Sequence, residues 1–237
     1  MGRQDEQIRA MVEAYDEEAE ATGWLGPEVA FGLAYKYIQP GQSILDIGIG
    51  TGLGSVLFRK AGLKVYGMDV SQEMLDACCS KGFTNLTRHD LTKLPYPYDS
   101  ESLDLAVCVG VLNFFSDLSA VFGESARILR KGGLFVFVVG DRTENEAMEV
   151  VVGAEHTQSG APVTMYLHSA RQINRWVNEN GFAPLRSLAF TVHMDRKKTQ
   201  SLRASAYLAR KRESIEQSLG GDALQRASRL PLSSNEL

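Results

Sequence analysis

Short apolar runs alternate with amphipathic segments along most of this chain of 237 residues. Apolar runs rich in β-branched residues are typical of buried parallel strands, whereas apolar positions spaced three or four apart indicate helices. We therefore expect strands near residues 44–47, 64–68, 83–88, 102–109 and 134–139, and helices near 4–21, 27–38, 55–60, from 71 onward, 116–129 and 169–180. Strands alternating with helices predict an α/β domain built on a mostly parallel sheet.

The C-terminal third departs from this alternation. Residues 140–168 are rich in Gly, Thr, Glu and Ser, and we expect a long functional loop there. Two further strands are expected, over residues 185–194 and 202–209. Beyond residue 210 the chain is polar, with Gly220-Gly221 and a Ser-rich end, which predicts a fraying helix followed by a disordered tail.

Residues 43–54, with the sequence SILDIGIGTGLG, are the strongest chemical signal. A strand, a glycine-rich turn and a helix in succession let the backbone approach a ligand closely, because glycine has no Cβ and adopts positive φ. A dinucleotide fingerprint would need the spacing G-x-G-x-x-G. Counting from Gly48 places Leu53 at the third glycine position, and counting from Gly50 places Ser55 there, so that pattern fails.

The pattern that is present, an acid followed by three alternating glycines from Asp46 to Gly52, resembles motif I of the class I S-adenosylmethionine-dependent methyltransferases. Four further features stand at the distances that this family requires. They are Asp69 after the second strand, Asp90 after the third, the GVLNFF stretch after the fourth, and the LRKGG turn at residues 129–133. The resemblance covers roughly residues 10–210 and points to the branch that acts on small molecules of unassigned identity.

The resemblance implies a Rossmann-like, doubly wound α/β fold with a seven-stranded sheet, mostly parallel, whose last strand is inserted antiparallel. It implies three segments: a helical lid at 1–40, a methyltransferase domain at 41–210 and a C-terminal tail at 211–237. It also implies S-adenosyl-L-methionine as the cofactor. Asp69 would hold the ribose hydroxyl groups and Asp90 the adenine amino group. The residues expected at the cofactor are Tyr15, Trp24, Asp46, Gly48, Gly50, Thr51, Gly52, Asp69, Val70, Met74, Asp90, Leu91, Val109 and Gly110.

The composition of the chain limits the classes of partner that we expect it to bind. The formal net charge of −4 argues against a dominant nucleic-acid or anionic-membrane surface. Cys78, Cys79 and Cys108 have no metal-ligand spacing and form no disulfide framework, so we expect a reduced, cytoplasmic protein without a metal. The polar N-terminus does not resemble a signal peptide, and no apolar run approaches a membrane span. The oligomeric state stays open.

The acceptor is expected to be a small molecule, methylated on oxygen or nitrogen by in-line displacement. Tyr15, Trp24, the turn at 113–115 and the loop at 141–168 would surround it with aromatic rings and few cations. The candidate general bases are Asn113, Asp141, Tyr166 and His168, and the sequence does not rank them. Two alternatives remain open: a non-catalytic module that binds S-adenosylmethionine, and an NAD-type oxidoreductase. The missing fingerprint glycine and the two C-terminal strands argue against the oxidoreductase.

Overall fold

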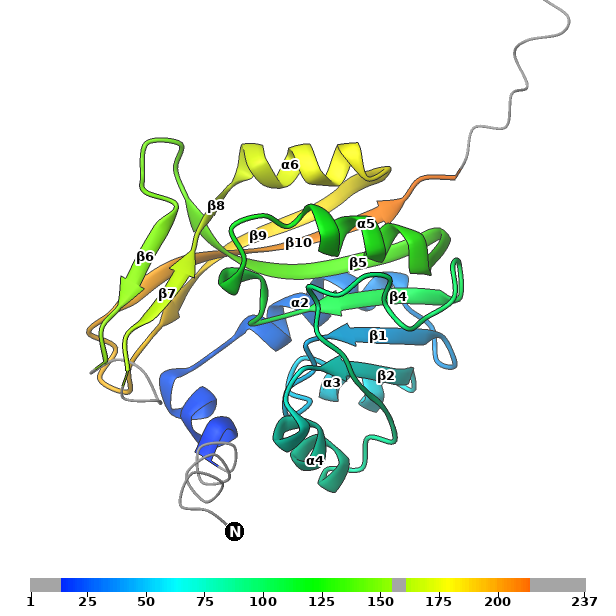
Figure 1. The fold of residues 1–237 in the computed structure, drawn as a ribbon, viewed down its shortest axis with the longest axis horizontal. Helices are drawn as coiled ribbons and strands as arrows, with labels where there is room; N and C mark the ends of the chain where they lie inside the picture. The colour runs from blue at the N-terminus through cyan, green and yellow to red at the C-terminus, as the bar shows by residue number, and fades with distance from the viewer. Residues whose placement is uncertain (1–13, 155–160, 214–237) are drawn as a thin grey trace, which may run out of the picture.

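The computed structural model describes residues 14–154 and 161–213. Its centre is a twisted sheet with the strand order β3-β2-β1-β4-β5-β10-β9 (Figure 1). The strands β1 to β5 run parallel, whereas β10 runs antiparallel to both β5 and β9. The bounds are β1 Ser43–Ile47, β2 Lys64–Asp69, β3 Asn85–Arg88, β4 Leu103–Cys108, β5 Leu129–Arg142, β9 Phe182–His193 and β10 Ser201–Lys211. The expected mostly parallel sheet with an antiparallel last strand is confirmed; a short strand, β8 His168–Ser169, pairs with β5 and adds an eighth strand to the seven expected.

Helices cover both faces of this sheet (Figure 1). One face carries α2, α3 and α4, which bury Leu33, Phe58 and Leu75. The other face carries α5 and α6, which bury Phe122 and Trp176. The helix bounds are α2 Gly26–Ala34, α3 Val56–Lys60, α4 Gln72–Ser80, α5 Ser119–Ile128 and α6 Ala170–Glu179, with 3-10 turns η1 Tyr35–Tyr37 and η2 Leu112–Phe114.

Local sequence explains where these helices begin. The side chain of Ser71 accepts a hydrogen bond from the amide of Met74 and caps α4. Ser169 and Gln172 form a reciprocal capping box at the start of α6. Pro27 stands in the first turn of α2, where its missing N–H costs nothing. The caps fix the helix starts within a few residues of the positions expected from the sequence.

The segment between β5 and α6 is more regular than its composition predicts. It forms a two-stranded antiparallel hairpin, β6 Glu149–Val152 with β7 Val163–Tyr166, and a short strand β8 His168–Ser169 beside the end of β5. The expectation of a loop without regular structure was wrong here. The β-branched residues of EVVV and VTMY favour strands, but the surrounding Gly, Thr and Ser residues conceal two such short runs.

At the N-terminal end, residues 14–22 are helical, and α2 follows after a break at Gly23. The remainder of the expected first helix, and the tail beyond residue 213, lie outside the described residues, so the expectation for the tail stays a prediction. No helix in the described ranges is long and apolar enough to cross a membrane.

Candidate functional site

The glycine-rich loop connects the carboxyl end of β1 to α3 and adopts a backbone that only glycine tolerates well. Gly48 and Gly52 have φ angles of 75° and 94°. A Cβ on Gly48 would lie 2.4 Å from a methyl group of Val111, and a Cβ on Gly52 would lie 2.6 Å from the ring of Phe83. The loop is therefore packed tightly against the turn after β4 and against the end of α4. Gly50, between these two glycines, also has a positive φ, of 54°.

Asp46 stands under this loop and is almost fully buried, with 2% of its surface exposed. Its Oδ2 accepts a hydrogen bond of 2.6 Å from the hydroxyl of Ser55. Burial raises the pKa of Asp46 to about 7; the Ser55 hydrogen bond opposes this shift and the negative charge of Asp69 adds to it. The acid of the motif thus supports the loop from beneath.

Asp69 ends β2 and joins the loop to the next helix. Its Oδ2 accepts from the amide of Gly50 at 2.9 Å, and its Oδ1 accepts from the amide of Ser71 at 2.9 Å. A carboxylate oxygen has two lone pairs, so both oxygens can accept a further hydrogen bond from a neighbouring hydroxyl group. The carboxylate is held in place by two backbone groups from different segments.

The residues expected at the adenine follow β2 and β3. The side chain of Val70 is 58% exposed, so it is accessible to a ligand. The Oδ1 of Asp90 accepts from the amide and the hydroxyl of Thr92, and these bonds lower the pKa of Asp90. Met74 is half-buried in the first turn of α4, whereas Leu91 is buried in the core. Leu91 can therefore offer a ligand mainly its backbone.

The N-terminal helix lies against the glycine-rich loop. The hydroxyl of Thr51 donates a 2.6 Å hydrogen bond to Oδ1 of Asp16, and Lys81 at the end of α4 forms an ion pair with Oδ2 of the same residue. Burial raises the pKa of Tyr15, and the negative charges of Asp16 and Asp69 raise it further. The phenol of Tyr15 is therefore near the carboxylate of Asp69, although 54 residues of sequence separate the two.

The segment after this helix reaches the other side of the site. The Trp24 ring lies 3.9 Å from the position of a Cβ on Gly110, which has a φ of 79° and follows the half-buried Val109. The same ring lies 6.4 Å from the ring of Phe190 on β9. Glu18 in the N-terminal helix forms an ion pair of 2.5 Å with Arg196, which lies in the turn between β9 and β10. Tyr15 and Trp24 thus border the site from opposite sides.

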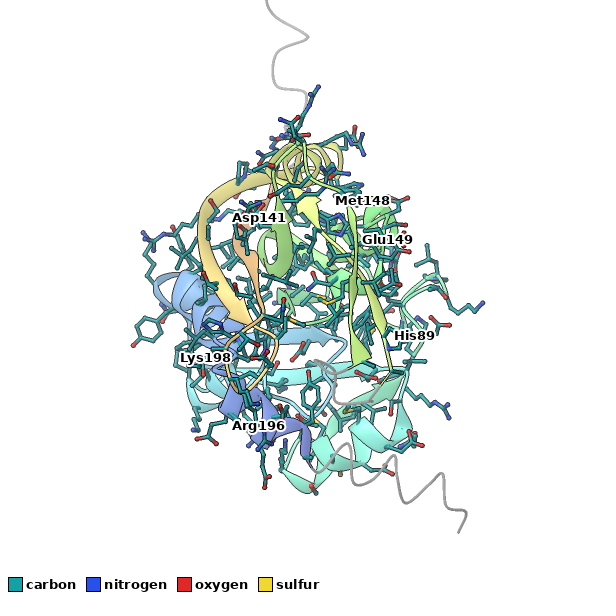
Figure 2. All side chains as sticks on the ribbon, turned by 90° about the vertical axis from the view of Figure 1, so that its left-hand side faces the viewer. His89, Asp141, Met148, Glu149, Arg196 and Lys198 are labelled. Atoms are coloured by element: carbon teal, nitrogen blue, oxygen red, sulfur yellow. The ribbon has the colours of Figure 1, made fainter. Side chains whose placement is uncertain are left out.

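The residues expected at the cofactor gather at the carboxyl ends of β1, β2, β3 and β4. Figure 2 views this edge, with His89, Asp141, Met148, Glu149, Arg196 and Lys198 labelled around it. In open α/β sheets ligands bind beyond this edge, where neighbouring connections leave in opposite directions. A cleft of about 440 Å³ opens near Lys64, Tyr98 and Arg130 at the amino ends of the strands, away from this edge.

Comparison with known proteins agrees with this geometry. Residues 45–137 match the family model described as a methyltransferase domain. Residues 45–137 thus form a methyltransferase domain, and the chain is similar to the class I S-adenosylmethionine-dependent methyltransferases. A methyltransferase structure from Methanosarcina mazei superposes on this class I fold with a TM-score of 0.65 and 16% identity, covering 76% of this chain and 97% of that one.

Two curated relatives are similar in sequence to this chain. The malonyl-[acyl-carrier protein] O-methyltransferase of Serratia marcescens is 30% identical over 130 residues, which are 53% of this chain and 50% of that protein. The ubiquinone biosynthesis O-methyltransferase of Actinobacillus pleuropneumoniae is 26% identical over 166 residues, 61% of this chain and 71% of that one. The chain thus spans about half the length of the Serratia relative.

The structure distinguishes the four candidate bases. Oδ1 of Asn113 accepts from the amide of Gly140 at 2.6 Å and joins η2 to β5. Asp141, at the end of β5, accepts from the hydroxyl of Ser205 at 2.9 Å. Tyr166 is half-buried on β7. Asp141 and Tyr166 are the two partly exposed candidates that can ionise.

His168 differs from the other candidates because it is completely buried. Its ring packs edge-on against Trp176 at 5.4 Å between centroids, and neither ring nitrogen has a hydrogen-bond partner in the described structure. Burial lowers the pKa of His168, and the nearby carbonyl groups of Leu112 and Phe115 oppose the shift without reaching hydrogen-bond geometry. A neutral imidazole in this position acts as a core residue.

Sequence reasoning missed the residues that hold the site together. Asp16 belongs to an acidic helix face that the sequence marks only as exposed, and its partners are 35 and 65 residues away. Arg142 is the other omission. Its guanidinium donates to the carbonyls of Leu167, Thr143, Glu144 and Glu146 and to the side chain of Gln172. Arg142 is the only Arg or Lys within residues 141–168, and this could have identified it as a residue that holds the segment together.

Proposed function

We propose that this protein transfers a methyl group from S-adenosylmethionine to an oxygen or nitrogen atom of a small-molecule acceptor. The observation that carries the proposal is the position of Asp69, fixed between the amide of Gly50 and the amide of Ser71 at the carboxyl edge of the sheet. Both relatives named above are O-methyltransferases by name, which favours oxygen as the methylated atom.

In this proposal Asp69 accepts hydrogen bonds from the two ribose hydroxyl groups, and Val70 and Met74 pack against the adenine. Asp90 accepts from the adenine amino group, since its Oδ2 has no partner among the described residues. The backbone of Gly48, Gly50, Thr51 and Gly52 borders the methionine part of the cofactor, with Val109 and Gly110 facing the sulfonium. Tyr15 and Trp24 close the site from above.

In this proposal the main task of the protein in methyl transfer is to align the methyl donor with the acceptor. Bound S-adenosylmethionine would supply a methyl group activated by the sulfonium sulfur, and the sulfur would leave as a thioether with the electron pair of the broken carbon–sulfur bond. Holding donor and acceptor in line can supply most of the acceleration. An acceptor that carries a proton on the attacking atom must lose it, and Asp141, at the end of β5, is the candidate base for this step.

Calorimetry with S-adenosylhomocysteine and, separately, NADH tests the cofactor. We expect binding of the first and none of the second. Replacing Asp69 by Ala removes charge-assisted hydrogen bonds worth about 1.5–3 kcal/mol, so the affinity should fall roughly tenfold or more. Asp76→Ala is the matched control, because Asp76 is exposed on α4 and, within the described part of the chain, accepts a hydrogen bond from Gln72 of the same helix alone. Normal affinity in Asp69→Ala would place the ribose elsewhere.

A screen with methyl-labelled S-adenosylmethionine against pools of small metabolites tests the transfer itself. Labelled product that forms with the natural protein but not with Asp69→Ala would support the proposal that the protein is an enzyme. Cofactor binding without transfer to any pool would instead favour the non-catalytic binding module. The cytoplasmic location, and acceptors other than nucleic acids, stay predictions.

A further inference from the structure

The hairpin formed by β6 and β7 stands beside the proposed acceptor space. It leaves the sheet after the end of β5 and extends along the carboxyl edge, toward the N-terminal helix and the turn between β9 and β10 (Figure 1). Its second strand, β7, packs against η2, the turn that directly follows the cofactor residues of β4. The hairpin therefore adjoins the end of the cofactor site from which the methyl group leaves.

The two faces of this hairpin differ in character. Val150 lies opposite Met165, and Val152 opposite Val163, so these four apolar side chains share one face, which we call the inner face. They are half-buried or buried. The outer face carries Glu149, Val151, Thr164 and Tyr166, and three of these four are exposed; Val151 is 61% exposed.

The inner face does not belong to either core of the domain. The buried residues under α5 and α6 form one cluster, those under α2, α3 and α4 form another, and neither includes a residue of the hairpin. Val152 and the neighbouring Leu167 are nevertheless buried, at 8% and 7% exposure. The hairpin thus shelters an apolar surface at the carboxyl edge that the folding of the central sheet does not require.

Charge completes the description of this surface. Arg142, the only Arg or Lys between residues 141 and 168, donates hydrogen bonds to the carbonyl groups of Leu167 and Glu146 and to the side chain of Gln172, and these bonds hold the base of the hairpin. Arg203 on β10 is paired with Glu146. The segment therefore offers no uncommitted Arg or Lys to an anionic group, and a carboxylate or phosphate buried here would lose its hydration without a partner.

We propose that the inner face of the β6–β7 hairpin binds the body of the methyl acceptor and selects a neutral, apolar molecule over an anionic one. This inference rests on the proposed function, because it takes the cofactor to occupy the neighbouring site. The occupant is the acceptor itself: an uncharged ring or hydrocarbon body packs against Val150 and Met165 while its nucleophilic atom points toward the sulfonium.

Two fluorescent probes that differ by one charged group test the proposal on the full chain saturated with S-adenosylhomocysteine. N-phenyl-1-naphthylamine is neutral, and 8-anilinonaphthalene-1-sulfonate is its close anionic relative. We expect the neutral probe to bind at least tenfold more tightly. Val150→Thr and Met165→Gln keep side-chain shape but add polarity, and each should weaken the neutral probe roughly fivefold, as expected for losing an apolar contact.

Val151→Thr is the matched control, since it makes the same chemical change one residue away on the outer face; it should leave probe affinity unchanged. Equal weakening by Val151→Thr and Val150→Thr would overturn the proposal, and so would tight binding of the sulfonate. Should Met165→Gln fail to fold, Val150→Thr decides alone. Titration of each variant with S-adenosylhomocysteine separates the two claims. Unchanged cofactor binding with no difference between the faces would refute only this inference, whereas absent cofactor binding would refute the proposed function.

Discussion

Replacing Asp46 by Asn should abolish a specific part of the pH dependence of stability. Burial raises the pKa of Asp46 to about 7 in the folded protein, from 3.8 in an exposed carboxyl. The folded protein therefore holds a proton that the unfolded chain releases, so the fold loses stability as pH rises from about 4 to about 7, and the loss is complete above 7. The full shift corresponds to about 4 kcal/mol.

As pH rises from 5 to 8, ionisation of this carboxyl should lower the free energy of unfolding by roughly 2–3 kcal/mol. The Asn side chain does not titrate, and its carbonyl can still accept the hydroxyl of Ser55, which now bonds to Oδ2 of Asp46. Its extra N–H group is a new buried donor and lowers stability by about 1–3 kcal/mol at all pH values. The variant should therefore be less stable than the natural protein at pH 5 and similar or more stable at pH 8.

Urea unfolding at pH 5, 6, 7 and 8 measures this, with the difference between the two proteins plotted against pH. Subtracting the unfolding free energies of the two proteins at each pH cancels the contributions of other titrating groups. His168 is one of them, and its lowered pKa makes stability rise with pH over part of this range, opposite to the effect of Asp46. Ser55→Ala should extend the loss of stability to higher pH, because the hydrogen bond that lowers the pKa of Asp46 is lost. Parallel pH curves for the natural protein and Asp46→Asn would refute the reasoning.

Two further predictions concern the segments that border the site. Asp16→Ala removes the acceptor for Thr51 and the partner of Lys81, so S-adenosylhomocysteine should dissociate about three- to tenfold faster in stopped-flow measurements; an unchanged rate would mean that the N-terminal helix does not retain the cofactor. Arg142→Met removes the hydrogen bonds at the base of the hairpin and should lower stability by about 2 kcal/mol, or the melting temperature by roughly 4–8 °C; a shift below 1 °C would show that the hairpin is held by other contacts.

The sequence predicted the central sheet well because its strands are buried on both faces. Such strands are continuous apolar runs, as in residues 134–139, and their glycine-bounded ends are visible without any partner. The antiparallel insertion of β10 followed only from the family resemblance. The positions of Asp69 and Asp90 were also readable, because acids that directly follow strands must emerge at the carboxyl edge.

The remaining parts of the site depend on partners far apart in the chain. Nothing in the acidic face of residues 14–22 distinguishes Asp16, which bonds to Thr51, from Glu17, which is exposed. The inner face of the hairpin escaped detection for another reason. Strands of four residues provide only two positions for each face, too few for a period to stand out from the surrounding loop.

The two sides of the proposed site are suited to different halves of the reaction. The cofactor side is rich in carboxylates and backbone amides, as Asp69 with Gly50 and Ser71 illustrates, and it can hold a polar, cationic donor. The hairpin side is apolar and has no uncommitted cation in its described part. Transfer of the methyl group to a hydroxyl oxygen, whose proton would pass to the carboxylate of Asp141, would convert the sulfonium into a neutral thioether and yield a neutral ether. A reaction that removes charge from the reacting centre is favoured where the surroundings solvate charge poorly. An apolar wall beside the sulfonium would therefore select an uncharged acceptor and also assist the transfer.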